Sequence, residues 1–178
     1  MKLTRRGFLN ISTAAAVVCA AALLPVEKAA AAQQTMAAQE LLEQAYLYAF
    51  PLVLMDATRK VSTNAETPND TRAPINQFIH AKKLADAAFR TVVTPNVDTI
   101  YTQAFLDVGA EPMLYGVPQT DRFFNVQVLD AWTNTVAVLE APGLYAITRS
   151  DWQGKLPEGV QRINVPTNTV WTIARIVL

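Results

Sequence analysis

The segment 94–101 holds the densest group of polar side chains in the sequence that could carry out chemistry. Asn96, Asp98 and Tyr101 place an amide, a carboxylate and a phenol close together at the start of a predicted strand. If the segment is extended, Asn96 and Asp98 project to one side and line a site for a hydroxylated or cationic small molecule. Asp98 is then the candidate general base. Turn formation is the alternative, because Asn and Asp residues after Pro can satisfy their own backbone.

A second polar group surrounds Trp132, directly after the most regular predicted strand, 124–129. An aromatic ring beside amides and a carboxylate is typical of a ligand pocket, so this group could form the opposing wall of the same cavity. Alternatively, Trp132 is a core residue with its indole N–H satisfied, and Asp130 only ends the strand. The predicted ligand-binding set is Asn96, Asp98, Tyr101, Gln127, Asp130 and Asn134.

His80 is the only histidine, so one chain cannot assemble a metal site that needs two or three histidines, and we predict no metal site. Ser62 and Ser150 do not lie in a Gly-x-Ser-x-Gly elbow, which disfavours a Ser-His-Asp triad. His80 is instead expected as a partly exposed helix residue or as a hydrogen-bond partner of the polar cluster. The 6 glycines are scattered and form no phosphate loop, and the sequence identifies no cofactor.

The first 32 residues have the layout of a signal peptide. Arg5 and Arg6 come shortly before an apolar run, 11–24, and a small-residue stretch, 29–32. The arginine pair resembles the twin-arginine export motif, so we expect the twin-arginine translocase as a partner and a periplasmic or secreted location. A membrane anchor is the alternative, but the apolar run is short for that role. The single cysteine, Cys19, lies within this segment, so the exported protein would contain no disulfide.

Residues 33–178 carry 11 basic and 14 acidic side chains, which gives a net charge of −3 and argues against nucleic-acid binding. These 146 residues suffice for one domain that buries roughly 70% of its unfolded surface. The composition, 51% hydrophobic and 17% charged, is too apolar for a disordered chain. No segment after the leader reaches the roughly 18 consecutive apolar residues of a membrane span.

Two helices are predicted before residue 91. Apolar residues at spacings of three and four predict a helix over 36–60, capped by Thr35 and apolar on nearly all sides. Pro51 should kink it or divide it into two helices that meet near Phe50. A polar loop over 61–74 follows, and Pro74 is placed to begin a second helix that reaches about residue 88.

After residue 91 the apolar period changes to two, which predicts six or seven strands in a sandwich or barrel. The last strand is apolar and runs to the final residue, so we expect it to form an open edge that something else must cover. The predicted strands are 100–108, 124–129, 135–139, 144–148, 160–164 and 170–178.

Several motifs occur in a characteristic order and spacing along the sequence: 45–52 (AYLYAFPL), 96–101 (NVDTIY), 106–108 (LDV) with 111–112 (EP), and 166–168 (PTN) with 170–171 (VW). Together they resemble the bacterial domain of unknown function 1254 across residues 40–178. The resemblance implies an α+β, mainly β fold with N-terminal helices (33–90) packed on an antiparallel jelly-roll-like sandwich (91–178). Members are often exported and usually continue into a domain of unknown function 1214, which we expect this chain to lack. No general activity is established for the family, so the resemblance implies no catalytic residue.

Two functions remain open from the sequence. In the first, an exported domain binds or hydrolyses a small molecule in the polar pocket described above. In the second, the chain is a non-catalytic structural subunit that pairs with a separately encoded C-terminal domain or with copies of itself, as the apolar first helix suggests.

Overall fold

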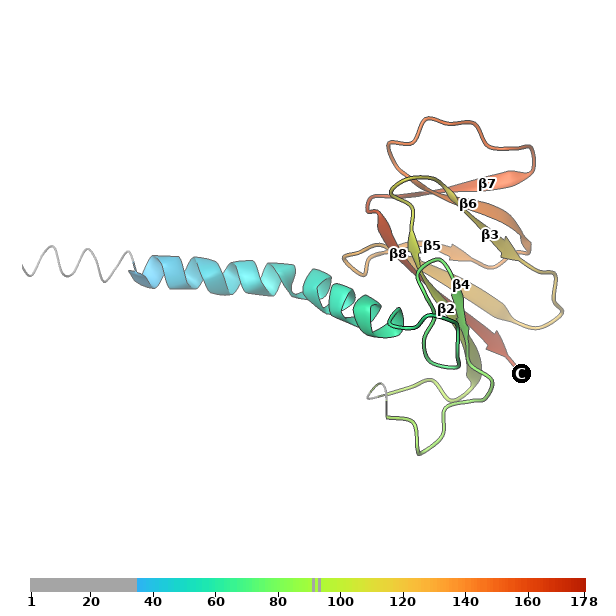
Figure 1. Ribbon diagram of the computed structural model, residues 1–178, viewed down its shortest axis with the longest axis horizontal. Helices are drawn as coiled ribbons and strands as arrows, with labels where there is room; N and C mark the ends of the chain where they lie inside the picture. Colours follow the sequence, from blue (N-terminus) through green and yellow to red (C-terminus); the bar gives the residue numbers. More distant parts are fainter. Residues whose placement is uncertain (1–34, 91, 93) are drawn as a thin grey trace, which may run out of the picture. The chain divides into compact units, whose positions relative to one another are not determined.

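The computed structural model describes residues 35–90, 92 and 94–178. The chain divides into two units, Met1–Ala49 and Phe50–Leu178. Figure 1 draws the helix and the strands of the described residues. The described residues of the first unit are all helical, and the second unit holds all of the strands. The predicted export segment lies outside the described residues. No helix among the described residues is both long and apolar enough to cross a membrane.

Residues 35–62 are helical, which confirms the predicted helix over 36–60. Pro51 lies within this helical run, and the division between the two units falls just before it, between Ala49 and Phe50. Thr63 follows the last helical residue, and both its N–H and its hydroxyl donate to the Arg59 carbonyl, each at 2.8 Å. These two bonds satisfy a carbonyl that a helix end would otherwise leave without a partner.

The predicted second helix over 74–88 is wrong. Asn76 has a φ of 65°, in the left-handed region, so a right-handed helix cannot pass through it. Its N–H donates to the Phe105 carbonyl at 2.8 Å, and its side-chain oxygen accepts the Asp107 N–H at 2.8 Å. The following residues form strand β1 (Phe78–His80), in which Ile79 is buried between exposed neighbours. Pairing with a distant strand therefore overrides the local helical pattern.

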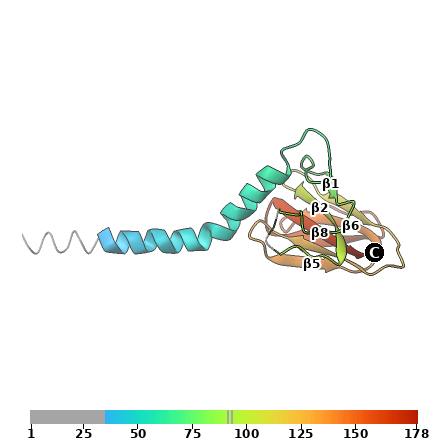
Figure 2. The ribbon, with the colours of Figure 1, turned by 90° about the horizontal axis from the view of Figure 1, so that it is seen from below.

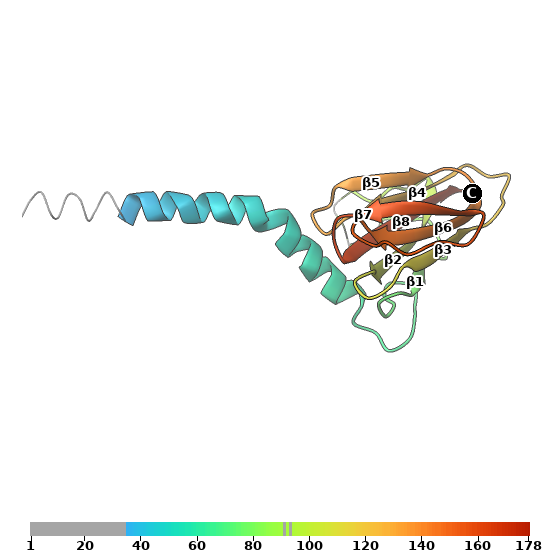
Figure 3. The same ribbon diagram turned by 90° about the horizontal axis from the view of Figure 1, so that it is seen from above.

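The described residues contain eight strands in two sheets, whose strands can be followed in Figures 2 and 3. The larger sheet has the order β1-β2-β8-β4-β5, and the smaller has the order β3-β6-β7. All six predicted strands are present, whereas β1 and β3 were not predicted; Gly116 and Pro118 within and after β3 obscure its pattern. The remaining bounds are β2 (Thr99–Asp107), β3 (Met113–Val117), β4 (Phe124–Leu129), β5 (Thr135–Leu139), β6 (Gly143–Arg149), β7 (Val160–Val165) and β8 (Thr169–Val177).

The expectation of an open edge at the last strand is wrong, because β8 is the central strand of the larger sheet. It pairs with β2 on one side and with β4 on the other, both antiparallel. Its apolar sequence is that of a strand hydrogen-bonded on both edges, and the sheet edges fall on β1 and β5 instead. The sandwich is also not wholly antiparallel, since β6 and β7 pair in parallel.

The core lies between the two sheets and draws alternate residues from each strand. A second buried group lies on the opposite face of the larger sheet, where Phe105 stacks on Trp171 at 5.2 Å and Ile79 is 3% exposed. The main core comprises Ala104, Leu106, Val108, Tyr115, Val117, Phe124, Val126, Val128, Leu139, Tyr145, Ile147, Val165, Val170 and Ala174. This fold is mainly β with a single N-terminal helix, as an open sandwich.

Candidate functional site

The structure gives Asn96 the role of a turn residue at the entrance to β2. Its side-chain oxygen accepts the N–H groups of Asp98 at 2.7 Å and of Thr99 at 3.2 Å. Asp98 is exposed, and its carboxylate makes no hydrogen bond or ion pair with any other described residue. This geometry matches the turn alternative, in which Asx side chains satisfy the local backbone.

Tyr101 and Gln127 lie on the face of the larger sheet that turns away from the core. Arg175 on β8 connects them: its guanidinium lies 5.7 Å from the Tyr101 ring centroid and donates to the Gln127 side-chain oxygen at 3.2 Å. Gln127 in turn donates to the Thr135 hydroxyl at 2.7 Å. Arg175 is not among the predicted site residues, although it is the only charged residue of the final strand.

Asp130 and Asn134 belong to the turn between β4 and β5. Asp130 is 3% exposed, and its carboxylate accepts the N–H groups of Trp132 and Asn134, both at 2.9 Å, and the Asn134 amide at 3.0 Å. The Asp130 N–H donates to the Asn134 carbonyl at 3.0 Å, which closes the turn. The carboxylate is therefore used within its own turn, as the strand-ending alternative for Asp130 describes.

The two predicted walls lie at opposite ends of the larger sheet. Thr99, next to Asp98, pairs with Val177, whereas Leu129, next to Asp130, pairs with Trp171. These two positions are six residues apart on β8, which is roughly 20 Å along a strand. The structure therefore does not bring the six predicted residues into one cavity, and ligand binding by any of them stays a prediction.

A different cavity, of about 570 Å³, lies at one end of the sandwich where the chain crosses from β3 to β4. Its volume falls within the roughly 300–1,000 Å³ of ordinary ligand pockets. Side chains from both sheets and from the connecting segment line it. They are Phe78, His80, Thr102, Tyr115, Gly116, Val117, Pro118, Gln119, Thr120, Arg122, Phe124, Val126, Ala174 and Ile176.

Aromatic rings form much of one wall of this intersheet cavity. Phe78 lies edge-on to Tyr115 with 5.4 Å between ring centroids, and it is 5.6 Å from the His80 ring. Tyr115 is 4% exposed, and this burial raises the pKa of its phenol, while a hydrogen bond with Thr172 acts in the opposite direction. The phenol therefore stays neutral at physiological pH and serves as a hydrogen-bonding group.

The polar groups of the intersheet cavity come from β1, β2 and the connection 118–122. His80 Nδ1 lies 3.0 Å from the Thr102 hydroxyl, and the donor depends on which ring nitrogen carries the proton. The Arg122 backbone N–H donates to the Thr120 hydroxyl at 3.1 Å, which folds this connection back on itself. The lining contains no carboxylate. It therefore offers an apolar wall with a few donors, an arrangement that binds ligands.

Of these lining residues, only His80 stands out as a candidate from the sequence. The expectation that His80 lies on a helix is wrong, because it ends strand β1. The remaining lining residues come from strands far apart in the sequence, so no local motif could reveal the cavity. In the part of the chain that the structure describes, no three His, Cys, Asp or Glu side chains gather closely enough to hold a metal ion.

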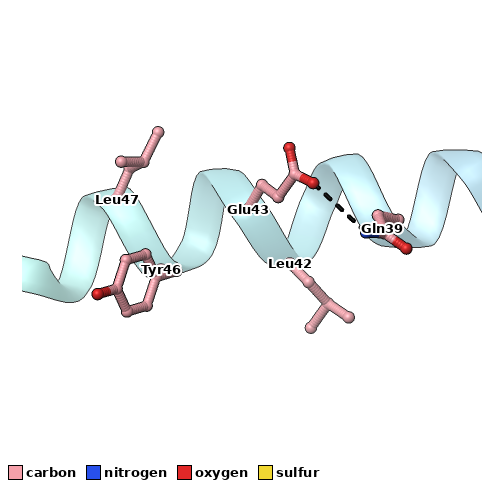
Figure 4. A pocket seen from close by; sticks show the side chains of 5 residues that line it. All are labelled: Gln39, Leu42, Glu43, Tyr46 and Leu47. Atoms are coloured by element: carbon pink, nitrogen blue, oxygen red, sulfur yellow. Dashed lines mark hydrogen bonds between the residues drawn. The ribbon is translucent and has the colours of Figure 1, made fainter.

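Two other pockets have fewer polar groups available to bind a ligand. One lies in the first unit, where a single helix supplies Gln39, Leu42, Glu43, Tyr46 and Leu47 (Figure 4). Its polar groups are already joined, since the Gln39 amide donates to Glu43 at 3.5 Å. The other pocket, of about 410 Å³, lies along β5 and β7 and includes Arg162. That guanidinium is held by Thr148, Asn164 and the Trp152 carbonyl, so it has little capacity left for a ligand.

Comparison with known proteins supports the same family that the motifs indicated. The model of the family described as "Protein of unknown function (DUF1254)" matches residues 75–178. The chain resembles the crystal structure of the VPA0106 protein from Vibrio parahaemolyticus with a TM-score of 0.60 and 24% sequence identity. That match covers 78% of this chain and 33% of that chain, so this chain spans about a third of its length. The likeness shows the fold. No curated protein matches the sequence.

Proposed function

Because the chain belongs to a family of proteins of unknown function, DUF1254, we propose its function from its own geometry: it is an exported protein that binds a small molecule in the intersheet cavity. The observation that carries this proposal is the cavity of about 570 Å³, with an apolar wall and a few polar groups supplied by His80, Thr102 and Arg122. A cavity of this size and character is the usual form of a small-molecule site.

Binding is better supported than hydrolysis. General-base catalysis needs a group within hydrogen-bond reach of the proton it removes. The predicted base, Asp98, does not line the intersheet cavity, and no other carboxylate does. His80 is already paired with Thr102 through Nδ1. The proposed function therefore assigns no catalytic residue and treats the cavity as a binding site.

The export part of the proposal depends on the leader sequence. We propose that Arg5 and Arg6 direct the protein through the twin-arginine translocase to the periplasm. Replacing both by Lys should keep the protein in the cytoplasm, as measured by fractionation of the source cells and immunoblotting. Unchanged periplasmic recovery of the Lys–Lys variant would refute this route.

Native mass spectrometry of the protein purified from the periplasm of its source tests the binding proposal. Ala174 is 6% exposed, belongs to the core and lines the cavity, so Ala174→Leu fills part of the space. Ala137→Leu is the matched control, because Ala137 packs against the same core but does not line this cavity. We expect the wild type and Ala137→Leu to retain an extra mass of a few hundred daltons and Ala174→Leu to lose it.

The mass measurement also yields a clear negative result. An unliganded wild type, or an extra mass that Ala174→Leu retains at full occupancy, argues against the intersheet cavity as the site. Thermal denaturation of both Leu variants accompanies the experiment, so that loss of ligand is compared between proteins of similar stability. An overpacked core typically costs roughly 1–3 kcal/mol, which a protein of ordinary stability survives.

One observation favours the alternative function, a structural subunit that associates with copies of itself. Leu41, Leu42 and Leu47 are each about two-thirds exposed or more. The described residues of the first unit form one helix, and a single helix cannot bury side chains on several of its own faces. This function predicts a multimer by light scattering that Leu42→Glu with Leu47→Glu reduces to a monomer, whereas Gln44→Glu does not. A monomeric wild type rules it out.

A further inference from the structure

The charge of the intersheet cavity indicates which kind of molecule it takes. Arg122 is the only Lys, Arg, Asp or Glu residue that lines it. The adjacent acid, Asp121, is exposed and is not part of the lining. Arg122 is always protonated at physiological pH, so the cavity carries a fixed positive charge beside an apolar wall. A ligand with a negative group at one end and an apolar body complements both features.

Arg122 differs from several other arginines in what its guanidinium contacts. Arg59 pairs with Asp56 at 2.7 Å, and Arg149 pairs with Asp151 at 2.6 Å. Arg175 is held by Gln127. Among the described residues, no side chain hydrogen-bonds to the Arg122 guanidinium or forms an ion pair with it; its only hydrogen bond to a side chain uses the backbone N–H. Its planar group therefore remains available for an external acceptor.

The remaining polar groups suit the same kind of ligand. The Thr120 hydroxyl accepts the Arg122 N–H, which leaves its own hydrogen to donate. The engagement of His80 Nδ1 with Thr102 leaves Nε2 as the second polar atom of the ring. A single guanidinium with a few neutral donors matches a carboxylate, which it can bind through two parallel hydrogen bonds.

We propose that the intersheet cavity binds a small amphipathic carboxylate, with its carboxylate on Arg122 and its apolar body against the wall formed by Phe78, Phe124 and Ile176. This inference rests on the proposed function and adds the class of ligand. It requires an anion-specific contribution from Arg122 in addition to the burial of apolar surface.

Three ligands that share one hydrocarbon chain test the inference: decanoate, decan-1-ol and decyltrimethylammonium. They are titrated into the protein by calorimetry, below the micelle concentrations of the two ionic ligands and below the solubility limit of decan-1-ol. Decanoate should bind at least about tenfold more tightly than decan-1-ol, since a hydrogen bond to a charged group is worth that much or more. Decyltrimethylammonium should bind most weakly because it places a second positive charge beside Arg122.

Substitution of Arg122 tests whether this residue causes the preference for decanoate over decan-1-ol. Arg122→Gln should remove the preference for decanoate and leave the binding of decan-1-ol within about twofold of the wild-type value. Arg90→Gln is the matched control, since Arg90 does not line the intersheet cavity, and it should retain the preference. Equal loss of all three ligands in Arg122→Gln would overturn the inference, because it would mark Arg122 as a structural residue.

Failure of this inference can be distinguished from failure of the proposed function. Equal affinities for decanoate and decan-1-ol, both abolished by Ala174→Leu, would overturn the anion preference and leave the intersheet cavity as a binding site. Absence of binding by all three ligands also overturns the inference, whereas the proposed function is judged separately by the ligand mass retained from the source.

Discussion

Replacing Asp130 by alanine should destabilise the protein strongly, although the sequence marks this residue equally well as part of a ligand site. The buried carboxylate accepts three hydrogen bonds, from the backbone N–H groups of Trp132 and Asn134 and from the Asn134 side chain, at 2.9–3.0 Å. Alanine leaves all three donors of the turn without this acceptor. When a donor that is shielded from water loses its acceptor, the loss of folding free energy exceeds the net contribution of the hydrogen bond itself.

The size of the effect follows from these contacts. Hydrogen bonds to a charged group contribute about 1.5–3 kcal/mol each, and removing the buried carboxylate recovers part of its desolvation cost. We therefore expect the free energy of unfolding to fall by about 2–4 kcal/mol, a large part of the roughly 5–15 kcal/mol of an ordinary domain. The melting temperature should fall by about 10 °C. Asp130→Asn keeps one acceptor oxygen and should lose only about 1 kcal/mol.

Urea denaturation followed by circular dichroism measures these changes, with Asp98→Ala as the control. Asp98 is exposed, and its carboxylate has no hydrogen-bond partner among the described residues, so its replacement should change stability by less than about 0.5 kcal/mol. A loss below about 0.5 kcal/mol in Asp130→Ala would refute the assignment of this carboxylate to the turn. An equal loss in both variants would refute the contrast between the two aspartates.

Two further predictions concern backbone conformation and pH. Thr133 has a φ of 67°, which is unfavourable for a β-branched residue. Thr133→Gly should therefore raise the free energy of unfolding, measured by urea denaturation, by about 1 kcal/mol. A destabilised variant would contradict this prediction. Burial raises the pKa of Tyr115, so the folded state holds this proton more tightly than the unfolded state does. Its contribution to stability is therefore complete below the unfolded-state pKa of about 10 and is lost as the pH rises further. Melting temperatures between pH 8 and 11 should fall less steeply in Tyr115→Phe than in the wild type, and parallel curves would disprove the effect.

Local patterns predicted the strands well because alternation of apolar residues is a property of each segment alone. The alternation over 124–129 and the apolar run 135–139 correspond to β4 and β5 at their observed bounds. The order of strands is not local. The sequence leads one to expect that the apolar last strand forms an edge that needs a cover, yet its pairing with both β2 and β4 places it at the centre of the sheet.

The same distinction explains the missed elements. Strand β1 has three residues, and its conformation depends on pairing with β2. In this pairing Phe78 lies opposite Ala104. Pro74 and the apolar residues after it favour a helix locally, but the left-handed Asn76 and its bonds to β2 prevent one.

The candidate site was the least predictable feature. Polar residues that are close in sequence, such as Asn96 and Asp98, are typical of ligand sites, but the same spacing is equally typical of turns. In the structure Asn96 is a turn residue. The intersheet cavity instead combines His80, Arg122 and Ala174, which are separated by tens of residues. Only the pairing of β1, β2, β8 and β4 in one sheet brings these residues together.

A methyl NMR titration of the full chain with decan-1-ol tests whether the intersheet cavity binds a ligand, because this neutral probe does not depend on the charge of Arg122. The account predicts that the largest chemical-shift changes occur at Val126, Ala174 and Ile176, which line the intersheet cavity. Saturable changes there would locate the binding site between the sheets. Changes confined to residues beside Asp98 or Asp130, with these three methyl-bearing residues unaffected, would contradict the account.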